Sequence, residues 1–325
     1  MSRLGASNTN TNTNTNTNTT FGGSQAGVAS GVRYNSQEFP KLLTDSIEFP
    51  AELPAGASDE DKKKYTAAKN AARTMKFRKY WDAELRASVY LNEFIVKNPD
   101  WFDNVTRALS EQHGLLKEQK AEQLRAVIGR ADEREPRFVE IIDQHEAEGA
   151  IKYWLGMLMI DPSSAPAAYA LIRVARRIGE VVVMCLKNEF REPRPSQVCP
   201  MIVPMVDPPI TPSFPAGHAL QSHLISKLVE LADRPFANRS MLYELSGRIA
   251  ENRIIAGLHY PLDNEAGVTA AELIFDRLMA DDGGEKRCPE FRKLVDAAKA
   301  ESKREQEGVD LGDPVKAGSN REDRS

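Results

Sequence analysis

The chain has 325 residues, of which 41% are hydrophobic and 28% are charged, and its formal net charge is −4. This balance indicates a globular protein of one large domain or two smaller ones, and it argues against general nucleic-acid binding because no basic domain stands out. Three scattered cysteines favour a reducing compartment, and neither a secretory signal nor an apolar run of about 18 residues is recognisable. We therefore expect a soluble, cytoplasmic protein without a membrane span.

Both ends of the chain are predicted to be disordered tails. Residues 1–32 contain an Asn-Thr repeat followed by Gly, Ser and Ala, a composition that cannot bury enough apolar surface to offset chain entropy. Residues 306–325 are charged and contain glycine. A helical domain is expected between the tails, over 33–305, and the prolines at its start predict an extended arm over 38–57.

Helical periodicity begins at Asp59, where Ser58 followed by three acidic residues indicates a capped helix start. Further helices are predicted at 83–97, 101–112, 117–130, 136–160, 164–189, 216–232, 236–256, 261–280 and 286–304. Eight prolines between Pro193 and Pro215 exclude a continuous helix there and predict a long ordered loop, which in a compact domain usually carries function. No alternation marks a sheet, so the expected fold class is all-α, a single compact multi-helix bundle.

The first chemical pattern is KNEFREPRP, from Lys187 to Pro195. Lys187 and Arg194 lie at a predicted helix end and in the following loop, and they offer a point charge and a planar fork that suit phosphate oxygens. Arg191 and Glu192, between them, are expected on the surface. By itself this block is better explained by a solvated basic helix end that complements the helix dipole.

The second pattern is SFPAGH, from Ser213 to His218, where the proline loop ends and a helix opens. The first N–H groups of a helix have no internal partner and form an anion site, which Gly217 leaves open to an oxyanion. His218 would lie beside that anion, although it could also be a satisfied helix-start histidine. His223 points about 140° away on the same helix, so a structural role is expected for it.

The third pattern is RIIAGLHYPLD, from Arg253 to Asp263. An aspartate four residues after a histidine can accept a hydrogen bond from Nδ1, which would leave Nε2 of His259 free to attack. Arg253 would add a second guanidinium to the anion. Asn252 and Asp263 could also be ordinary polar groups at helix ends.

Together the three blocks resemble the signature of the type 2 phosphatidic acid phosphatase and vanadium haloperoxidase superfamily, which is K-x6-RP, then PSGH, then SR-x5-H-x3-D. The matching residues are Lys187, Arg194, Pro195, Pro215, Gly217, His218, Arg253, His259 and Asp263. The compact layout, with 23 residues between Arg194 and His218, is most similar to the soluble bacterial non-specific acid phosphatases. Two positions depart from the signature, because Ala216 and Asn252 stand where the family has serine.

The resemblance implies an all-α fold of the acid phosphatase type and metal-independent hydrolysis of small phosphorylated substrates, with no cofactor. Asp263 would orient His259, the nucleophile that forms a phosphohistidine, and His218 would protonate the leaving oxygen. The phosphate would be bound by Lys187, Arg194, Arg253 and the N–H of Gly217. The family also implies that the chain can form a homo-oligomer.

Two alternatives use the same residues. The same superfamily includes vanadate-dependent haloperoxidases. In such an enzyme His259 would ligate vanadium, and vanadate would be the cofactor. In a non-catalytic helical binding module, only a relic anion site would remain. Ala216 weakens the phosphatase and the haloperoxidase interpretations equally, because loss of a hydroxyl donor to a bound anion costs about 1.5–3 kcal/mol where water does not replace it.

Overall fold

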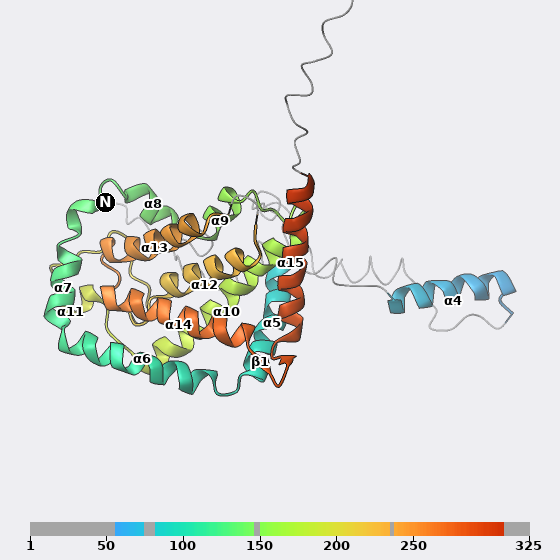
Figure 1. Ribbon diagram of the computed structural model, residues 1–325, viewed down its shortest axis with the longest axis horizontal. Helices are drawn as coiled ribbons and strands as arrows, with labels where there is room; N and C mark the ends of the chain where they lie inside the picture. Colours follow the sequence, from blue (N-terminus) through green and yellow to red (C-terminus); the bar gives the residue numbers. More distant parts are fainter. Residues whose placement is uncertain (1–55, 75–81, 146–149, 235–236, 309–325) are drawn as a thin grey trace, which may run out of the picture. The chain divides into compact units, whose positions relative to one another are not determined.

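The computed structural model describes residues 56–74, 82–145, 150–234 and 237–308 (Figure 1). The predicted tail 1–32, the arm as far as residue 55 and residues 309–325 lie outside this part. The chain divides into two units after Asp82. The first unit contributes helix α4 (Asp59–Thr74), which starts as predicted, because Ser58 Oγ accepts a hydrogen bond of 3.2 Å from the backbone N–H of Asp61.

The second unit is a compact all-α domain, and this coarse prediction is confirmed. Its helices are α5 (Ala83–Lys97), α6 (Trp101–Glu118), α7 (Lys120–Ile128), α8 (Phe138–Asp143), α9 (Ile151–Met157), α10 (Pro166–Phe190), α11 (Pro195–Val198), α12 (Gly217–Leu231), α13 (Arg239–Ile255), α14 (Pro261–Met279) and α15 (Pro289–Gly308). A 3₁₀ turn at Ala131–Glu133 follows α7. None of the described helices is long and apolar enough to cross a membrane.

Three details differ from the predicted elements. A short antiparallel hairpin, β1 (Asp281–Asp282) and β2 (Glu285–Lys286), precedes α15, turning through two glycines with φ of 59° and 96°. Helix α15 continues to Gly308, three residues into the predicted C-terminal tail. The proline loop contains the single-turn helix α11. The backbone N–H of Arg194 donates to Gln197 Oε1 at 2.7 Å, and the Arg194 carbonyl accepts from the backbone N–H of Gln197 at 3.0 Å.

The predicted helix 136–160 is instead two short helices, α8 and α9. Helix α8 ends at Gln144, whose buried side chain and carbonyl oxygen are both engaged by other elements. Asn252 Nδ2 donates to Gln144 Oε1 at 2.9 Å, and His218 Nε2 donates to the Gln144 carbonyl at 3.0 Å. These contacts reach Gln144 from residues 74 and 108 positions away, so periodicity along the chain does not reveal them.

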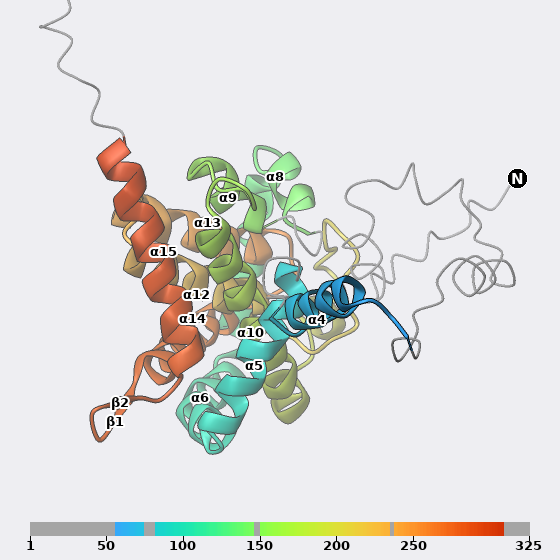
Figure 2. The ribbon, with the colours of Figure 1, turned by 90° about the vertical axis from the view of Figure 1, so that its right-hand side faces the viewer.

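Helix α12 is the central element, packed between α10, α13 and α14, and it lies beside them in both views (Figures 1 and 2). Its inward positions, Leu220, Leu224 and Leu228, are fully buried. The start of α12 lies against α14 because α14 carries Gly267 there, where a Cβ atom would be 2.6 Å from the carbonyl oxygen of Ala216. This close crossing sets the positions of the residues that open both helices.

Candidate active site

The predicted site residues lie at the ends of five helices, α10 to α14. Lys187 lies in the last turn of α10 and Arg194 begins α11. Gly217 and His218 open α12, Arg253 lies in the last turn of α13, and His259 and Asp263 flank the start of α14. A backbone hydrogen bond of 2.8 Å from Ala216 N–H to the Asp263 carbonyl joins the starts of α12 and α14.

His259 is oriented by Asp263. The Nδ1 atom lies 3.0 Å from Asp263 Oδ2, so the carboxylate holds a proton on Nδ1 and leaves Nε2 unprotonated. Nε2 in turn lies 3.4 Å from Arg194 Nη1, a donor. The histidine is 4% exposed and the aspartate is fully buried.

Asp263 is itself held by a residue for which the sequence predicted no role. Ser213 Oγ donates to Asp263 Oδ2 at 2.5 Å, and the backbone N–H of Tyr260 donates to the same oxygen at 3.0 Å. Asp263 Oδ1 is buried and has no hydrogen-bond partner among the described residues. Ser213 escapes a sequence search because its contact spans 50 positions and a serine before Phe-Pro has no periodic signal.

The cations of the first block are buried, so the interpretation as a solvated helix end is wrong. Lys187 is 3% exposed, and its Nζ donates to the carbonyl of Ser213 at 2.7 Å and to that of Pro212. Arg194 is 2% exposed and donates to the carbonyls of Thr211 and Leu258, each at 2.9 Å. The two side chains thus hold the end of the proline loop against the site.

Arg253 and His218 occupy the other side of the site. Arg253 is 1% exposed, and its Nη2 lies 3.3 Å from Nδ1 of His145. His218 is half-buried, and because its Nε2 donates to Gln144, Nδ1 is the nitrogen left for another partner. Gly217 has no side chain to cover the first N–H groups of α12. A Cβ atom at this position would lie 3.5 Å from Val183 Cγ1.

Burial and mutual repulsion lower the pKa values of the basic groups. The pKa of Lys187 falls to about 7 through burial and the charge of Arg194. Burial lowers the pKa values of Arg194 and Arg253 to about 10. The pKa of His259 lies well below its usual range because of burial and the charges of Arg194, Lys187 and Arg253, and that of His218 is lowered likewise by burial and Arg253.

These groups form an electrostatic arrangement that favours an anion. Burial raises the pKa of Asp263, which the hydrogen bonds from Ser213 and Tyr260 oppose. With both histidines neutral, three cationic side chains face one carboxylate, so two positive charges are in excess when all are ionised. A tetrahedral oxyanion with two negative charges would balance that excess.

Glu192 is buried rather than on the surface, which corrects the sequence prediction. Its side chain is 4% exposed and accepts hydrogen bonds from His113 Nε2 at 2.9 Å and Lys120 Nζ at 2.5 Å. Its carbonyl accepts from the backbone N–H of Ser213 at 2.7 Å. The burial follows from α6 and α7, which supply partners 72 and 79 positions away that no local pattern reveals.

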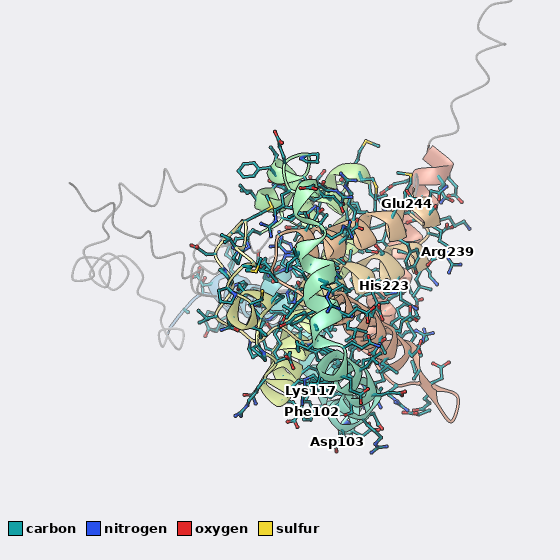
Figure 3. The ribbon with its side chains drawn as sticks, turned by 90° about the vertical axis from the view of Figure 1, so that its left-hand side faces the viewer. Phe102, Asp103, Lys117, His223, Arg239 and Glu244 are labelled. Carbon is teal, nitrogen blue, oxygen red and sulfur yellow. The ribbon has the colours of Figure 1, made fainter. Side chains whose placement is uncertain are left out.

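Asn252 and His223 lie outside the anion site. Asn252 is fully buried and links two elements, accepting from Arg137 Nη1 at 3.0 Å and donating to Gln144. It therefore supports the residue whose carbonyl holds His218. His223 (labelled in Figure 3) lies 2.8 Å from Glu272 Oε1, which agrees with the structural role predicted for it.

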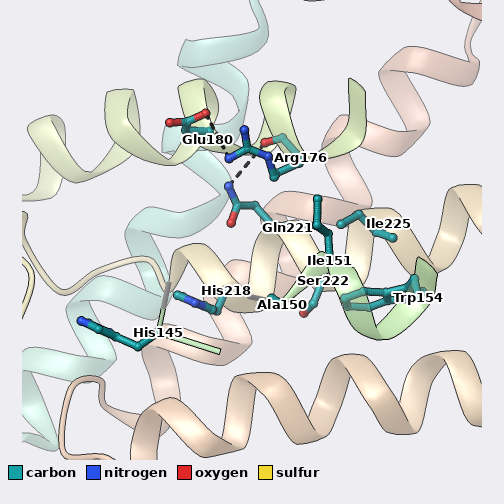
Figure 4. A pocket seen from close by; sticks show the side chains of 10 residues that line it. All are labelled: His145, Ala150, Ile151, Trp154, Arg176, Glu180, His218, Gln221, Ser222 and Ile225. Carbon is teal, nitrogen blue, oxygen red and sulfur yellow. Dashed lines mark hydrogen bonds and ion pairs between the residues drawn. The ribbon is translucent and has the colours of Figure 1, made fainter. Parts of the chain in front are cut away.

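A cavity of about 150 Å³ lies beside His218 (Figure 4). Its walls come from α10, α12, α9 and His145. Arg176 and Glu180 of α10 line it, as do Trp154 and Gln221. The sequence pointed to none of these residues, because they belong to faces of helices that meet only in the folded domain.

No three His, Cys, Asp or Glu side chains within the described ranges are grouped so that they could hold a metal ion. The three cysteines are free thiols. No protein-family model matches the sequence, and no curated protein matches it either.

Proposed function

We propose that this chain is a phosphatase of the acid phosphatase and haloperoxidase type, which hydrolyses small phosphomonoesters through a phosphohistidine intermediate. The observation that carries the proposal is the placement of His259. Asp263 holds its Nδ1 at 3.0 Å, while its Nε2 lies in a buried cluster of three cations. An anion-binding protein has no need of an oriented imidazole nitrogen at this place.

The reaction follows from these positions in two steps. Nε2 of His259 attacks phosphorus, the bond to the ester oxygen breaks, and Lys187, Arg194 and Arg253 stabilise the charge on the equatorial oxygens. Protonated His218 gives a proton from Nδ1 to the leaving oxygen while its Nε2 stays on the Gln144 carbonyl. Water then attacks phosphorus, His218 takes up its proton, and the phosphorus–nitrogen bond breaks to release phosphate.

The pKa of His259 agrees with its role as the nucleophile, and the pKa of His218 responds to the bound anion. A nucleophilic imidazole must be unprotonated, and burial beside three cations keeps the pKa of His259 well below its usual range. Burial and then the charge of Arg253 lower the pKa of His218, which disfavours its protonated form in the ligand-free site. A bound phosphate dianion would offset the charge of Arg253 and so favour the protonated acid. The free thiols agree with a reducing compartment such as the cytoplasm.

The test is metal-independent turnover. The purified full-length chain should hydrolyse 4-nitrophenyl phosphate in the presence of EDTA, and orthovanadate should inhibit it. The His259→Ala variant should lose at least about 10³-fold in kcat. The control is His223→Ala, which removes a histidine of α12 that pairs with Glu272 away from the anion site and should leave the rate unchanged.

The same experiment separates the alternatives. The residues of the site also suit vanadate, for which His259 Nε2 would be the ligand, so peroxide-dependent bromide oxidation after vanadate loading is measured in parallel. Bromide oxidation without phosphate release between pH 4 and 8 would replace the phosphatase by a haloperoxidase. Neither activity, together with measurable phosphate binding, would leave the non-catalytic module.

A further inference from the structure

The imidazole of His218, the proposed acid, is held by the end of helix α8. Its Nε2 donates to the carbonyl of Gln144 at 3.0 Å, and this is the hydrogen bond that the ring forms with the described part of the chain. The last carbonyls of a helix have no partner within it, so the carbonyl of Gln144, the C-cap of α8, is available to a distant donor. The orientation of the acid therefore depends on where this carbonyl lies.

The side chain of Gln144 keeps that carbonyl in place. Its Oε1 accepts from Nδ2 of Asn252 at 2.9 Å, and its Nε2 donates to Glu140 Oε1 at 3.3 Å. Gln144 and Asn252 are both fully buried, so bulk water does not replace their contact. Helix α13 is thus joined to the end of α8 through one pair of amides.

Arg137 determines the direction of this hydrogen-bond chain. A guanidinium can only donate, so the atom of Asn252 that lies 3.0 Å from Arg137 Nη1 must be the amide oxygen. The amide nitrogen of Asn252 then faces Gln144, whose oxygen accepts. Asn252 therefore uses both of its polar atoms, one toward Arg137 and one toward Gln144.

The end of α8 also borders Arg253, the neighbour of Asn252 on α13, but these contacts are longer. Arg253 Nη1 lies 3.4 Å from the carbonyl oxygen of Ile141, and Nη2 lies 3.3 Å from Nδ1 of His145. Hydrogen bonds of this length are weaker than one of 3.0 Å. A shift of this turn should therefore disturb His218 more than it disturbs the arginine of the anion site.

We propose that Asn252 is a positioning residue for general acid catalysis, which acts through Gln144 to orient His218 toward the leaving oxygen. Asn252 does not itself touch the substrate. The inference rests on the proposed phosphatase function and extends it to a residue that the sequence assigned only to an ordinary helix end. Its consequence is selective, because a leaving group that is a strong base needs the proton and a weakly basic one does not.

The experiment compares phenyl phosphate with 4-nitrophenyl phosphate in the Asn252→Ala variant. Phenolate is a much stronger base than 4-nitrophenolate, and kcat/KM reports the step in which the ester bond breaks. In the variant, kcat/KM for phenyl phosphate should fall at least about fivefold more than kcat/KM for 4-nitrophenyl phosphate. The inhibition constant of inorganic phosphate should stay within about twofold. A smaller fraction of folded protein would lower the rates of both substrates equally.

Two further variants calibrate the ratio of the two substrates. His218→Ala removes the acid itself and should change the ratio at least as much, and adding Asn252→Ala to it should change the ratio no further. The matched control is Asn98→Ala. Asn98 is also a fully buried asparagine, which donates to the Phe94 carbonyl at 2.9 Å and accepts from Arg287 Nη1 at 3.3 Å. Its loss should leave the ratio at the wild-type value.

A second positioning variant covers the case in which Asn252→Ala does not fold. Gln144→Met keeps the backbone carbonyl and the length of the side chain, but it removes the amide that binds Asn252. It should change the ratio of the two substrates in the same direction as Asn252→Ala and by a similar factor.

The outcomes separate this inference from the function on which it rests. A wild-type chain that hydrolyses no phosphomonoester overturns both. If His218→Ala lowers the rates of both substrates equally, the acid assignment fails and the inference fails with it. If His218→Ala is selective but Asn252→Ala and Gln144→Met affect both substrates equally, the positioning role is overturned and the phosphatase remains. An equal change of the ratio in Asn98→Ala would overturn the positioning role as well.

Discussion

Replacing Gly267 by alanine tests the close crossing that joins the two helix starts of the site. A Cβ atom at this position would lie 2.6 Å from the Ala216 carbonyl oxygen, 2.8 Å from the Ala219 Cβ and 3.1 Å from the Leu220 nitrogen. Two of these atoms belong to the backbone of α12 and cannot rotate away. Restoring ordinary contact of about 3.4 Å therefore requires α12 to move by about 0.8 Å relative to α14.

The expected loss of stability follows from that displacement. Overpacking of a tight core costs about 1–3 kcal/mol. Alanine in place of glycine within a helix contributes about 1 kcal/mol in the opposite direction. Gly247 of α13 isolates this second effect, because a Cβ atom there meets no described atom within 4 Å. The difference in free energy of unfolding between Gly267→Ala and Gly247→Ala should therefore be about 1–3 kcal/mol, with Gly247→Ala the more stable.

Activity should fall as well, because the displaced atoms belong to the turn that carries Gly217 and His218. A misplacement near 1 Å in a catalytic group costs about a hundredfold in rate, so a loss of tenfold or more in kcat is expected for Gly267→Ala. Urea denaturation of the two variants and hydrolysis of 4-nitrophenyl phosphate measure the two effects. Equal denaturation midpoints and equal rates for the two variants would refute the reasoning.

Three further changes probe the site itself. Asp263→Asn should lower kcat by about 10²–10⁴-fold with little change in phosphate affinity, because it removes the negative charge that stabilises the imidazolium formed when His259 attacks. An unchanged rate in steady-state assays contradicts this. Ala216 occupies the N-cap position of α12, with φ −73° and ψ 119°, so Ala216→Ser should raise the free energy of unfolding by about 0.5–2 kcal/mol. The same substitution should tighten inhibition by phosphate. No gain in either measurement argues against this prediction. Burial and the charge of Arg194 lower the pKa of Lys187 to about 7, so rising pH removes a cation from the ligand-free site. We therefore expect kcat/KM to fall above pH 7. A pH profile that stays level to pH 9 would show that the lysine keeps its charge.

Local sequence signals determined most of the helices. Helix α5 has the bounds predicted from periodicity, 83–97, and the starts of α12 and α14 lie within one residue of those expected. Proline and glycine punctuate these segments, and their backbone restrictions act within a few residues. Such signals fail at Gln144, where α8 ends because two distant residues bind its carbonyl and its side chain.

The sequence determined part of the candidate site, and only the tertiary structure determined the rest. The residue types of the three blocks, together with their resemblance to a family signature, named the seven proposed site residues, whereas each block by itself also had an ordinary structural explanation. The spacing could not reveal that Ser213 supports Asp263, that Glu192 is buried against α6 and α7, or that Asn252 donates to Gln144. These features arise where faces of separate helices meet, and the free energy of such contacts depends on the packing of the whole domain, which no local stretch of sequence encodes.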